Sequence, residues 1–197
     1  MSESPEGQRS RKLRADALRN RTKILQAAKR AFLESGTDSS LDDIATQAGV
    51  GSGTLYRHFP NRDSLIEAVY QAEVDRLVAR GRELADSDDP FEALRSWLLR
   101  FVDLVVQKHL AWAVLNSLAD GAARLLEQSR EQIWQTLTKL VDRAKATGQI
   151  NADLEPTDLL RAIVGVSMVA TIPDWEKSAR RLVDLLLAGA RARIEEQ

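Results

Sequence analysis

The sequence predicts an all-helical protein, and three observations lead to this prediction. Apolar residues recur three and four positions apart along most of the chain, as they do on one face of an α-helix. Gly and Pro residues separate these segments. The strict apolar and polar alternation that is typical of half-buried strands does not occur. We expect about nine helices, in two parts joined near the acidic stretch 86–90.

The composition suits a folded protein without cysteine chemistry. Hydrophobic residues make up 44% of the 197 residues, enough to bury a core. The absence of cysteine excludes disulfides, thiolate catalysis and Cys-type zinc sites. No apolar run approaches the roughly 20 residues of a membrane span, and the polar residues 1–10 do not resemble a signal peptide. We expect a soluble, cytoplasmic protein with no membrane partner, no metal and no cofactor.

The charge is unevenly distributed, although the net charge is only −1. Residues 9–62 hold eleven Lys and Arg against five Asp and Glu, whereas residues 63–197 hold seventeen against twenty-two. This difference suggests that the N-terminal part meets a polyanion. The alternative is an ordinary solvated basic helix face.

The first predicted helix runs from Ala15 to Glu34 and follows a polar stretch, residues 1–10. Its apolar stripe includes Leu25, Ala28 and Phe32. Gly36 then gives a natural C-terminal stop. Basic residues gather at and before the start of this helix: Arg9, Arg11, Lys12, Arg14, Arg19, Arg21 and Lys23.

Two short helices are expected next. Ser40, with Asp43 three residues later, reads as a capping box for a helix over Leu41–Ala48 that ends at Gly49. Ser52 is expected to cap a second short helix that runs to Phe59.

A longer helix over Arg62–Leu84 follows, with Asn61 as its cap, because Pro60 prevents the preceding helix from continuing. Two short helices joined by a Gly-containing turn, beside longer helices that can support them, are typical of a helix-turn-helix. A generic helical bundle is the alternative.

The stretch Leu41–Asp63, LDDIATQAGVGSGTLYRHFPNRD, resembles the DNA-binding motif of the TetR family of bacterial regulators. The resemblance rests on small residues at Ala45 and Gly49, on the Thr-Leu-Tyr-x-His-Phe run from Thr54, and on Arg62 at the next helix start. It implies a homodimeric regulator that binds a palindromic operator in double-stranded DNA. Together with the aromatic residues described below, it predicts a repressor that a small apolar or aromatic effector releases. An activator role stays open.

The expected divisions combine this resemblance with the helical pattern. They are a flexible basic arm over residues 1–13, a three-helix helix-turn-helix DNA-binding domain over 14–60, a connecting helix over 61–85 and a helical ligand-binding and dimerisation domain over 86–197.

The second short helix is the predicted recognition helix, whose first residues lie nearest the base edges. Arg57 is the candidate for a guanine contact through O6 and N7. The resemblance implies phosphate contacts from Tyr56 and His58, whose alternative is packing against the first helix, while Leu55 and Phe59 are expected in the core. The basic arm could enter a minor groove. The predicted DNA-contacting residues are Ser52, Gly53, Thr54, Tyr56, Arg57, His58 and Arg62.

The C-terminal part is expected to be helical throughout. The last two helices are almost wholly apolar, and the family resemblance implies a four-helix homodimer interface over residues about 156–193. The expected helices cover residues 91–108, 111–119, 123–147, 156–172 and 175–193.

Aromatic residues with a few polar neighbours suggest an effector pocket. Each of these residues taken singly is as well explained by core packing. The candidates are Trp97, Phe101, His109, Trp112, Asn116 and Trp134.

Two other classes of protein are alternatives to a regulator. An enzyme needs a catalytic constellation, but His58 and His109 lie in unrelated segments, and no HExxH, Gly-rich phosphate loop or activated-serine motif occurs. A relative that no longer binds DNA is disfavoured by the intact basic residues. We therefore expect a DNA-binding regulator and not an enzyme.

Overall fold

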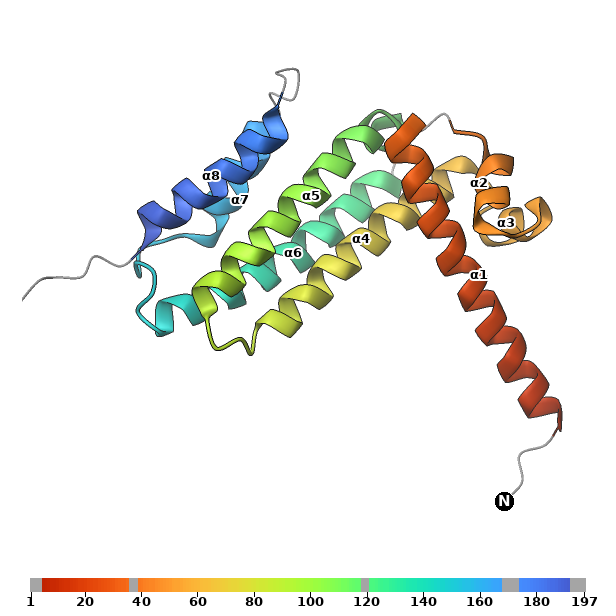
Figure 1. Ribbon diagram of the computed structural model, residues 1–197, viewed down its shortest axis with the longest axis horizontal. Helices are drawn as coiled ribbons and strands as arrows, with labels where there is room; N and C mark the ends of the chain where they lie inside the picture. Colours follow the sequence, from red (N-terminus) through yellow and green to blue (C-terminus); the bar gives the residue numbers. More distant parts are fainter. Residues whose placement is uncertain (1–4, 36–38, 118–120, 168–173, 192–197) are drawn as a thin grey trace, which may run out of the picture. The chain divides into compact units, whose positions relative to one another are not determined.

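The computed structural model describes residues 5–35, 39–117, 121–167 and 174–191, and within these ranges it is all-helical (Figure 1). The only extended pairing among the described residues is an isolated bridge between Ile150 and Arg191. The eight helices are α1 (Pro5–Ser35), α2 (Leu41–Ala48), α3 (Ser52–His58), α4 (Arg62–Leu84), α5 (Pro90–Ser117), α6 (Gly121–Ala146), α7 (Pro156–Ser167) and α8 (Trp175–Ala190).

The chain forms two compact units. The first comprises residues 1–72 with 110–122, and the second comprises residues 73–109 with 123–197. Helices α4, α5 and α6 each contribute residues to both units. Among the described helices none is both long and apolar enough to span a membrane.

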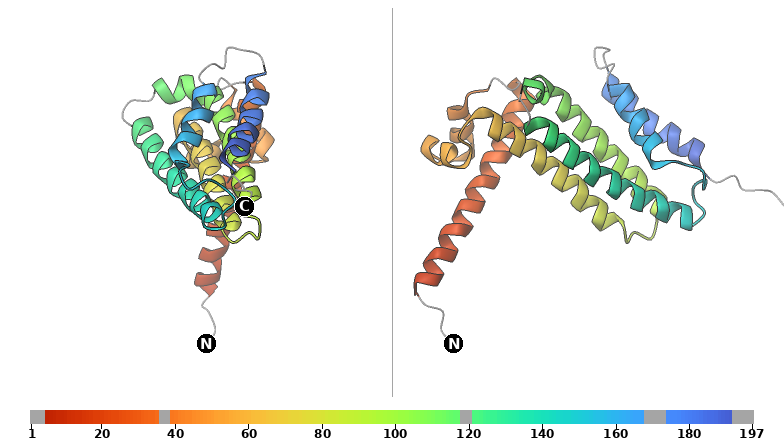
Figure 2. Two further views of the ribbon diagram at one scale, coloured as in Figure 1. Left: turned by 90° about the vertical axis from the view of Figure 1, so that its left-hand side faces the viewer. Right: turned by 180° about the vertical axis from the view of Figure 1, so that it is seen from behind.

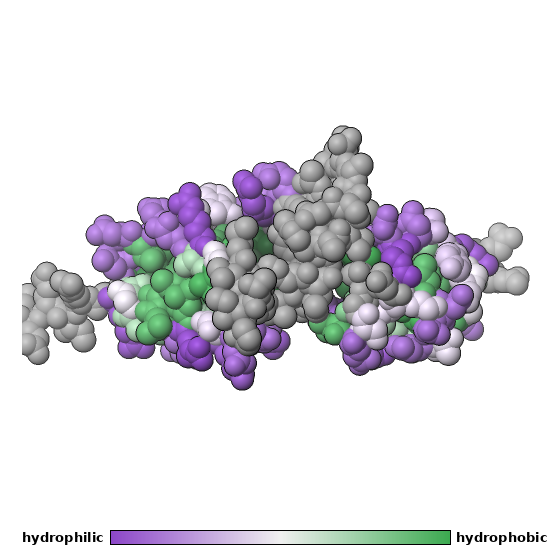
Figure 3. All heavy atoms as spheres, turned by 90° about the horizontal axis from the view of Figure 1, so that it is seen from above, coloured by the Kyte–Doolittle hydropathy of each residue, from purple (hydrophilic) through white to green (hydrophobic). Residues whose placement is uncertain are grey.

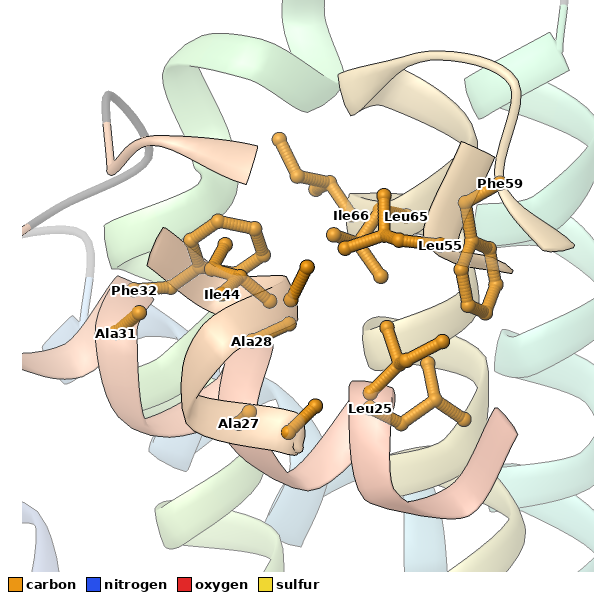
Figure 4. Packing of buried hydrophobic residues seen from close by; sticks show 13 residues of the cluster. Leu25, Ala27, Ala28, Ala31, Phe32, Ile44, Leu55, Phe59, Leu65 and Ile66 are labelled. Carbon is orange, nitrogen blue, oxygen red and sulfur yellow. The ribbon is translucent and has the colours of Figure 1, made fainter. Parts of the chain in front are cut away.

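The first unit has its hydrophobic core where α1, α2, α3 and the start of α4 meet (Figure 4). Leu55 and Phe59 point into this core and are almost fully buried, which confirms their predicted inner positions. The close packing of α1 and α2 depends on small side chains. The core includes Leu25, Ala27, Ala28, Ala31, Phe32, Ile44, Ala45, Leu55, Phe59, Leu65 and Ile66.

The helix caps of the first unit largely follow the sequence. The Ser40 hydroxyl accepts a hydrogen bond from the Asp43 backbone N–H at 3.4 Å, and the Asn61 side chain accepts one from Ser64 N–H at 2.8 Å. Gly49 ends α2 in the left-handed conformation, with φ of 66°, which favours glycine. The expected Ser52 cap is wrong, because Ser52 is already helical and Gly51 occupies the cap position without a side-chain bond.

Two expected helix boundaries are also wrong. Helix α1 begins at Pro5 rather than near Ala15, so residues 5–13 of the expected arm are helical. Pro is tolerated in a first helical turn, and the Arg, Lys and Leu residues that follow are good helix formers. Helix α5 is continuous from Pro90 to Ser117, where two helices were expected, because no Gly or Pro interrupts this stretch. The described residues therefore form eight helices, where about nine were expected.

In the second unit, the part of α4 after residue 72 lies beside α5 and α6 (Figures 1 and 2). The indole N–H of Trp97 on α5 donates to the Leu77 carbonyl oxygen on α4 at 3.0 Å. Gly81 on α4 is buried at this crossing. A Cβ atom at residue 81 would overlap the Cγ2 methyl group of Thr136 on α6 and lie 2.9 Å from Trp97 Nε1. The three helices therefore pack closely only because residue 81 has no side chain.

Helices α7 and α8 pack against each other, and two ion pairs join α8 to α5. Asp184 accepts from Arg95 Nε at 2.7 Å, and Arg180 pairs with Asp103. Hydrophobic residues gather on the outer surface of α7 and α8 (Figure 3, left). Leu185, with 69% of its surface exposed, is the most exposed large hydrophobic residue among those described.

Candidate nucleic-acid interface

A tight turn positions α3 against α2. The N–H groups of Gly49 and Val50 donate to the carbonyl oxygens of Thr46 and Ala45, each at 3.0 Å. Gly51, which is extended, then accepts the first hydrogen bonds of α3 from Thr54 N–H at 2.8 Å and Leu55 N–H at 3.2 Å. Because both ends of the turn are bonded to the helices, the direction of α3 is fixed by backbone geometry.

Helix α3 has one buried and one exposed face. Leu55 is completely buried, whereas Tyr56 is 44% exposed and Arg57 is exposed. This pattern agrees with a helix anchored by one face whose other face is available to a partner. Among the other predicted contact residues, Ser52 and Gly53 are exposed, and Thr54, His58 and Arg62 are half-buried.

The two glycines at the start of α3 are not required by the protein's own packing. A Cβ atom at Gly51 or at Gly53 would have no heavy-atom neighbour within 4 Å. Both have negative φ values, so backbone conformation does not demand glycine either. Because these residues have no side chains, a partner can approach the backbone of α3 closely at its start.

Arg62 has a structural contact that the sequence did not suggest. Its guanidinium donates to the Ser39 carbonyl oxygen at 2.7 Å and so joins the start of α4 to the residues before α2. The predicted phosphate contact of Arg62 stays a prediction. The bond could not be read from the sequence because the two residues are 23 positions apart.

The end of α3 lies against aromatic and basic groups. The guanidinium carbon of Arg21, on α1, lies 5.5 Å from the centre of the Phe59 ring, which suits a cation–π contact. The rings of His58 and Phe59 are 6.1 Å apart. His58 is half-buried and Tyr56 is 44% exposed, and the phosphate contacts of both residues stay predictions.

The comparisons with known families decide what this helix-turn-helix belongs to. Residues 24–69 match the bacterial regulatory proteins of the tetR family, and residues 89–192 match the C-terminal domain of SbtR-like transcriptional regulators. The chain belongs to the TetR family. It is thus a DNA-binding transcriptional regulator, of a family that is not enzymatic. The helix-turn-helix prediction is confirmed.

Individual relatives agree with this assignment. The regulator is 27% identical over 170 residues to the HTH-type transcriptional regulator UidR of Escherichia coli, covering 79% of this chain and 81% of UidR. It is 44% identical to the TetR transcriptional regulator SCO0520 of Streptomyces coelicolor, whose crystal structure matches with a TM-score of 0.74 over 87% of this chain and 98% of that one. A TetR regulator from Mycobacterium vanbaalenii is 29% identical, with a TM-score of 0.75 over 91% and 99% of the two chains.

The structure describes the side chains of three of the six predicted effector-pocket residues and brings two of these together. Trp97 and Phe101 are buried, with their rings stacked 5.9 Å apart and almost parallel, whereas Trp134 is 42% exposed. The side chains of the other three candidates, His109, Trp112 and Asn116, lie outside the described residues. Trp97 therefore serves the core, and the pocket stays a prediction.

The described residues offer no other candidate site of comparable definition. Among them, no group of three or more His, Asp or Glu side chains is placed to hold a metal ion.

Proposed function

We propose that the regulator binds a palindromic operator as a homodimer and represses transcription until a small apolar or aromatic effector releases it. The observation that carries the proposal is the two-sided character of α3. Leu55 is buried on its inner face, and the outer residues Ser52, Gly53, Tyr56 and Arg57 are exposed. A recognition helix enters the major groove with its first residues nearest the bases. Arg57 would then read a guanine, and Ser52 and Thr54 would bond to bases or phosphates.

The operator is tested by selection from random DNA duplexes, followed by a salt titration on the enriched site. We expect a palindrome whose half-sites are about one helical turn apart, roughly 34–36 Å. Its affinity should fall steeply as salt rises, because phosphate contacts release counterions. No enriched sequence, with only weak and salt-sensitive binding, would falsify the proposed function.

The proposed dimer uses the outer surface of α7 and α8. Val164 and Leu185 are exposed there although both are large and apolar. Gly165 and Gly189 on the same helices are also exposed and have open space around them. Exposed apolar residues next to small ones allow two helix pairs to approach closely, and the family typically dimerises.

Leu185→Glu tests this interface. Each copy of a two-fold dimer would lose a buried leucine, so we expect the dimer dissociation constant to rise by about 100-fold or more. Leu13→Glu is the matched control, because Leu13 is 64% exposed but lies on α1. Analytical ultracentrifugation should give a monomer for the first variant and a dimer for the second. Equal behaviour of the two variants would place the interface elsewhere.

The effector is proposed on the aromatic content of the second unit. A bound effector would favour a state whose recognition-helix spacing does not fit the operator. The operator complex is titrated with a panel of apolar aromatic compounds, and release is followed by fluorescence anisotropy. A compound that binds tightly without changing operator affinity would argue against release. If the protein instead stimulates transcription from a promoter that lies downstream of its operator, it is an activator and not a repressor.

A further inference from the structure

Helix α1 carries a single stripe of residues that changes character halfway along. Residues at positions 11, 14, 18, 21, 25, 28 and 32 are spaced by three and four, so they share one face of the helix. In the C-terminal half this stripe consists of Leu25, Ala28 and Phe32, all buried in the helix-turn-helix core. In the N-terminal half the stripe consists of Arg11, Arg14, Leu18 and Arg21.

We call the N-terminal half of α1, residues 5–23, the α1 extension. Every side chain described from residue 11 to residue 23 is exposed or half-buried. Figure 1 shows that the extension continues past α2 and α3 as a single helix. Leu18 is 67% exposed on the same face that is buried further along. The extension therefore presents its stripe to something other than the protein core.

The stripe faces the side on which α3 lies. Arg21 is its last basic member, and its guanidinium lies over Phe59, which directly follows α3. The stripe positions before Arg21 continue along the same line, away from the end of the recognition helix. Arg11 and Arg14 are thus placed beside the proposed DNA surface rather than behind it.

We infer that the α1 extension is a second DNA-binding element, which lies along the phosphate backbone beside each half-site through Arg11 and Arg14. The inference rests on the proposed operator binding by α3. Arginine is suited to phosphate because its planar guanidinium bonds two oxygens at once. Contacts of this kind position a protein and strengthen binding without reading sequence.

The helical state decides how the extension binds. An α-helix with its side chains is about 10–12 Å across, and the minor groove is only about 6 Å wide. The expected arm covered residues 1–13, and residues 5–13 of it are helical, so as part of α1 they are too wide for a minor groove. A helix of this diameter can instead lie against the backbone and neutralise phosphates.

An anionic membrane is a weaker match for the same charges. Helices that lie on membranes bury a continuous apolar face. The two exposed leucines of the extension, Leu13 and Leu18, are five residues apart and point to different sides of the helix. The extension offers charge and no apolar face, and it is continuous with the helix-turn-helix.

The length of the extension limits where it binds. From Pro5 to Arg21 the helix rises by about 24 Å. With base pairs about 3.4 Å apart, this reaches about seven base pairs. Duplexes that end at the half-site and duplexes that carry about eight more base pairs on each side should therefore differ in affinity.

The test uses the full-length chain and the operator enriched by selection, in a long and a short form. The variant R11Q/R14Q removes two charges from the stripe. K12Q/K23Q is the matched control, because Lys12 and Lys23 are exposed on the far side of the helix and removing them changes the net charge equally. R11K/R14K keeps the charge at the stripe. Thermal unfolding of each variant checks that the fold is intact.

For wild type we expect tighter binding to the long duplex than to the short one. R11Q/R14Q should lose this difference, with an affinity for the long duplex lower on the order of tenfold. The slope of log affinity against log salt concentration on the long duplex should also be shallower, by about 0.9 for each phosphate that is no longer neutralised. K12Q/K23Q should keep the preference, and R11K/R14K should keep most of the salt dependence.

Three outcomes overturn the inference alone, with α3 binding intact: no preference for the long duplex, equal reductions in affinity for R11Q/R14Q and K12Q/K23Q, or binding of anionic vesicles that depends on Arg11 and Arg14 while DNA binding does not. A wild-type protein that enriches no duplex overturns the proposed function as well, so the two failures can be told apart.

Discussion

The outer face of α3 and the crossing of α4, α5 and α6 both depend on glycine, for opposite reasons. At Gly53 an added Cβ atom would meet no neighbour within 4 Å, so the protein's own packing leaves the position open. At Gly81 the same atom would collide with Thr136 and approach Trp97. We propose that the lack of a side chain serves DNA binding in the first region, whereas it serves the protein's own core in the second. The two regions should therefore respond oppositely to the same substitution.

The largest expected effect is on the DNA side. Arg57→Ala should weaken operator binding by about 1–3 kcal/mol for each subunit if Arg57 reads a guanine, so by roughly 100-fold or more for a dimer. Stability should not change, because Arg57 is exposed. Anisotropy titrations of the operator measure the first quantity and thermal unfolding the second. A loss of stability equal to the loss of binding would mean that Arg57 supports the fold instead.

The second effect is on the core side. Gly81→Ala should lower the free energy of unfolding by about 1–3 kcal/mol, because overpacking outweighs the better helix propensity of alanine. Adding Thr136→Ser removes the Cγ2 methyl group that Cβ would strike, so the double variant should recover part of the loss. Urea unfolding of the two variants and of Thr136→Ser alone gives the coupling between the residues. Additive effects would show that the Thr136 methyl group is not the source of the loss in Gly81→Ala.

A smaller effect is expected at the neighbouring hydrogen bond. Trp97→Phe keeps an aromatic ring but removes the indole N–H that donates to Leu77 O at 3.0 Å. We expect a loss of about 1–2 kcal/mol, from the hydrogen bond and from the smaller ring. Phe101→Leu is a useful comparison, because it disturbs the ring stack and leaves the hydrogen bond in place. The position of the urea midpoint measures both.

The smallest effect on stability is the one that best separates the two regions. Gly53→Ala should stabilise the fold by up to about 1 kcal/mol, since alanine favours the helix and has room. The same substitution should weaken operator binding, because the added methyl group stands between α3 and the DNA. Gly53→Ala and Gly81→Ala are thus a matched pair with opposite signs in urea unfolding. Unchanged operator affinity in Gly53→Ala would remove the argument that this glycine serves the DNA.

The local signals in the sequence predicted the helix-turn-helix well. Ser40 and Asn61 cap their helices, Gly49 ends α2, and Leu55 and Phe59 are buried as the helical spacing indicates. These features involve residues only a few positions apart, whose geometry follows from backbone hydrogen bonding. The family was also recognisable from one short motif, Leu41–Asp63.

The wrong predictions have a common cause. The late start predicted for α1, the break predicted in α5 and the cap assigned to Ser52 all concern helix ends, where several adjacent residues are compatible with both states. The aromatic candidates could not be sorted from the sequence for another reason. Trp97, Phe101 and Trp134 look alike in the sequence, yet two are buried and the third is 42% exposed.

What the sequence alone determined about this protein is its all-helical class and the internal order of its DNA-binding motif, because short-range periodicity, caps and turns encode them. The family followed from the resemblance of the motif Leu41–Asp63. Only the tertiary structure decided the bond from Arg62 to Ser39, the position of Arg21 over Phe59, and the crowding of Gly81 between Thr136 and Trp97. Each of these joins residues 16 or more positions apart. Such contacts depend on how whole helices are placed, and no local pattern records that placement.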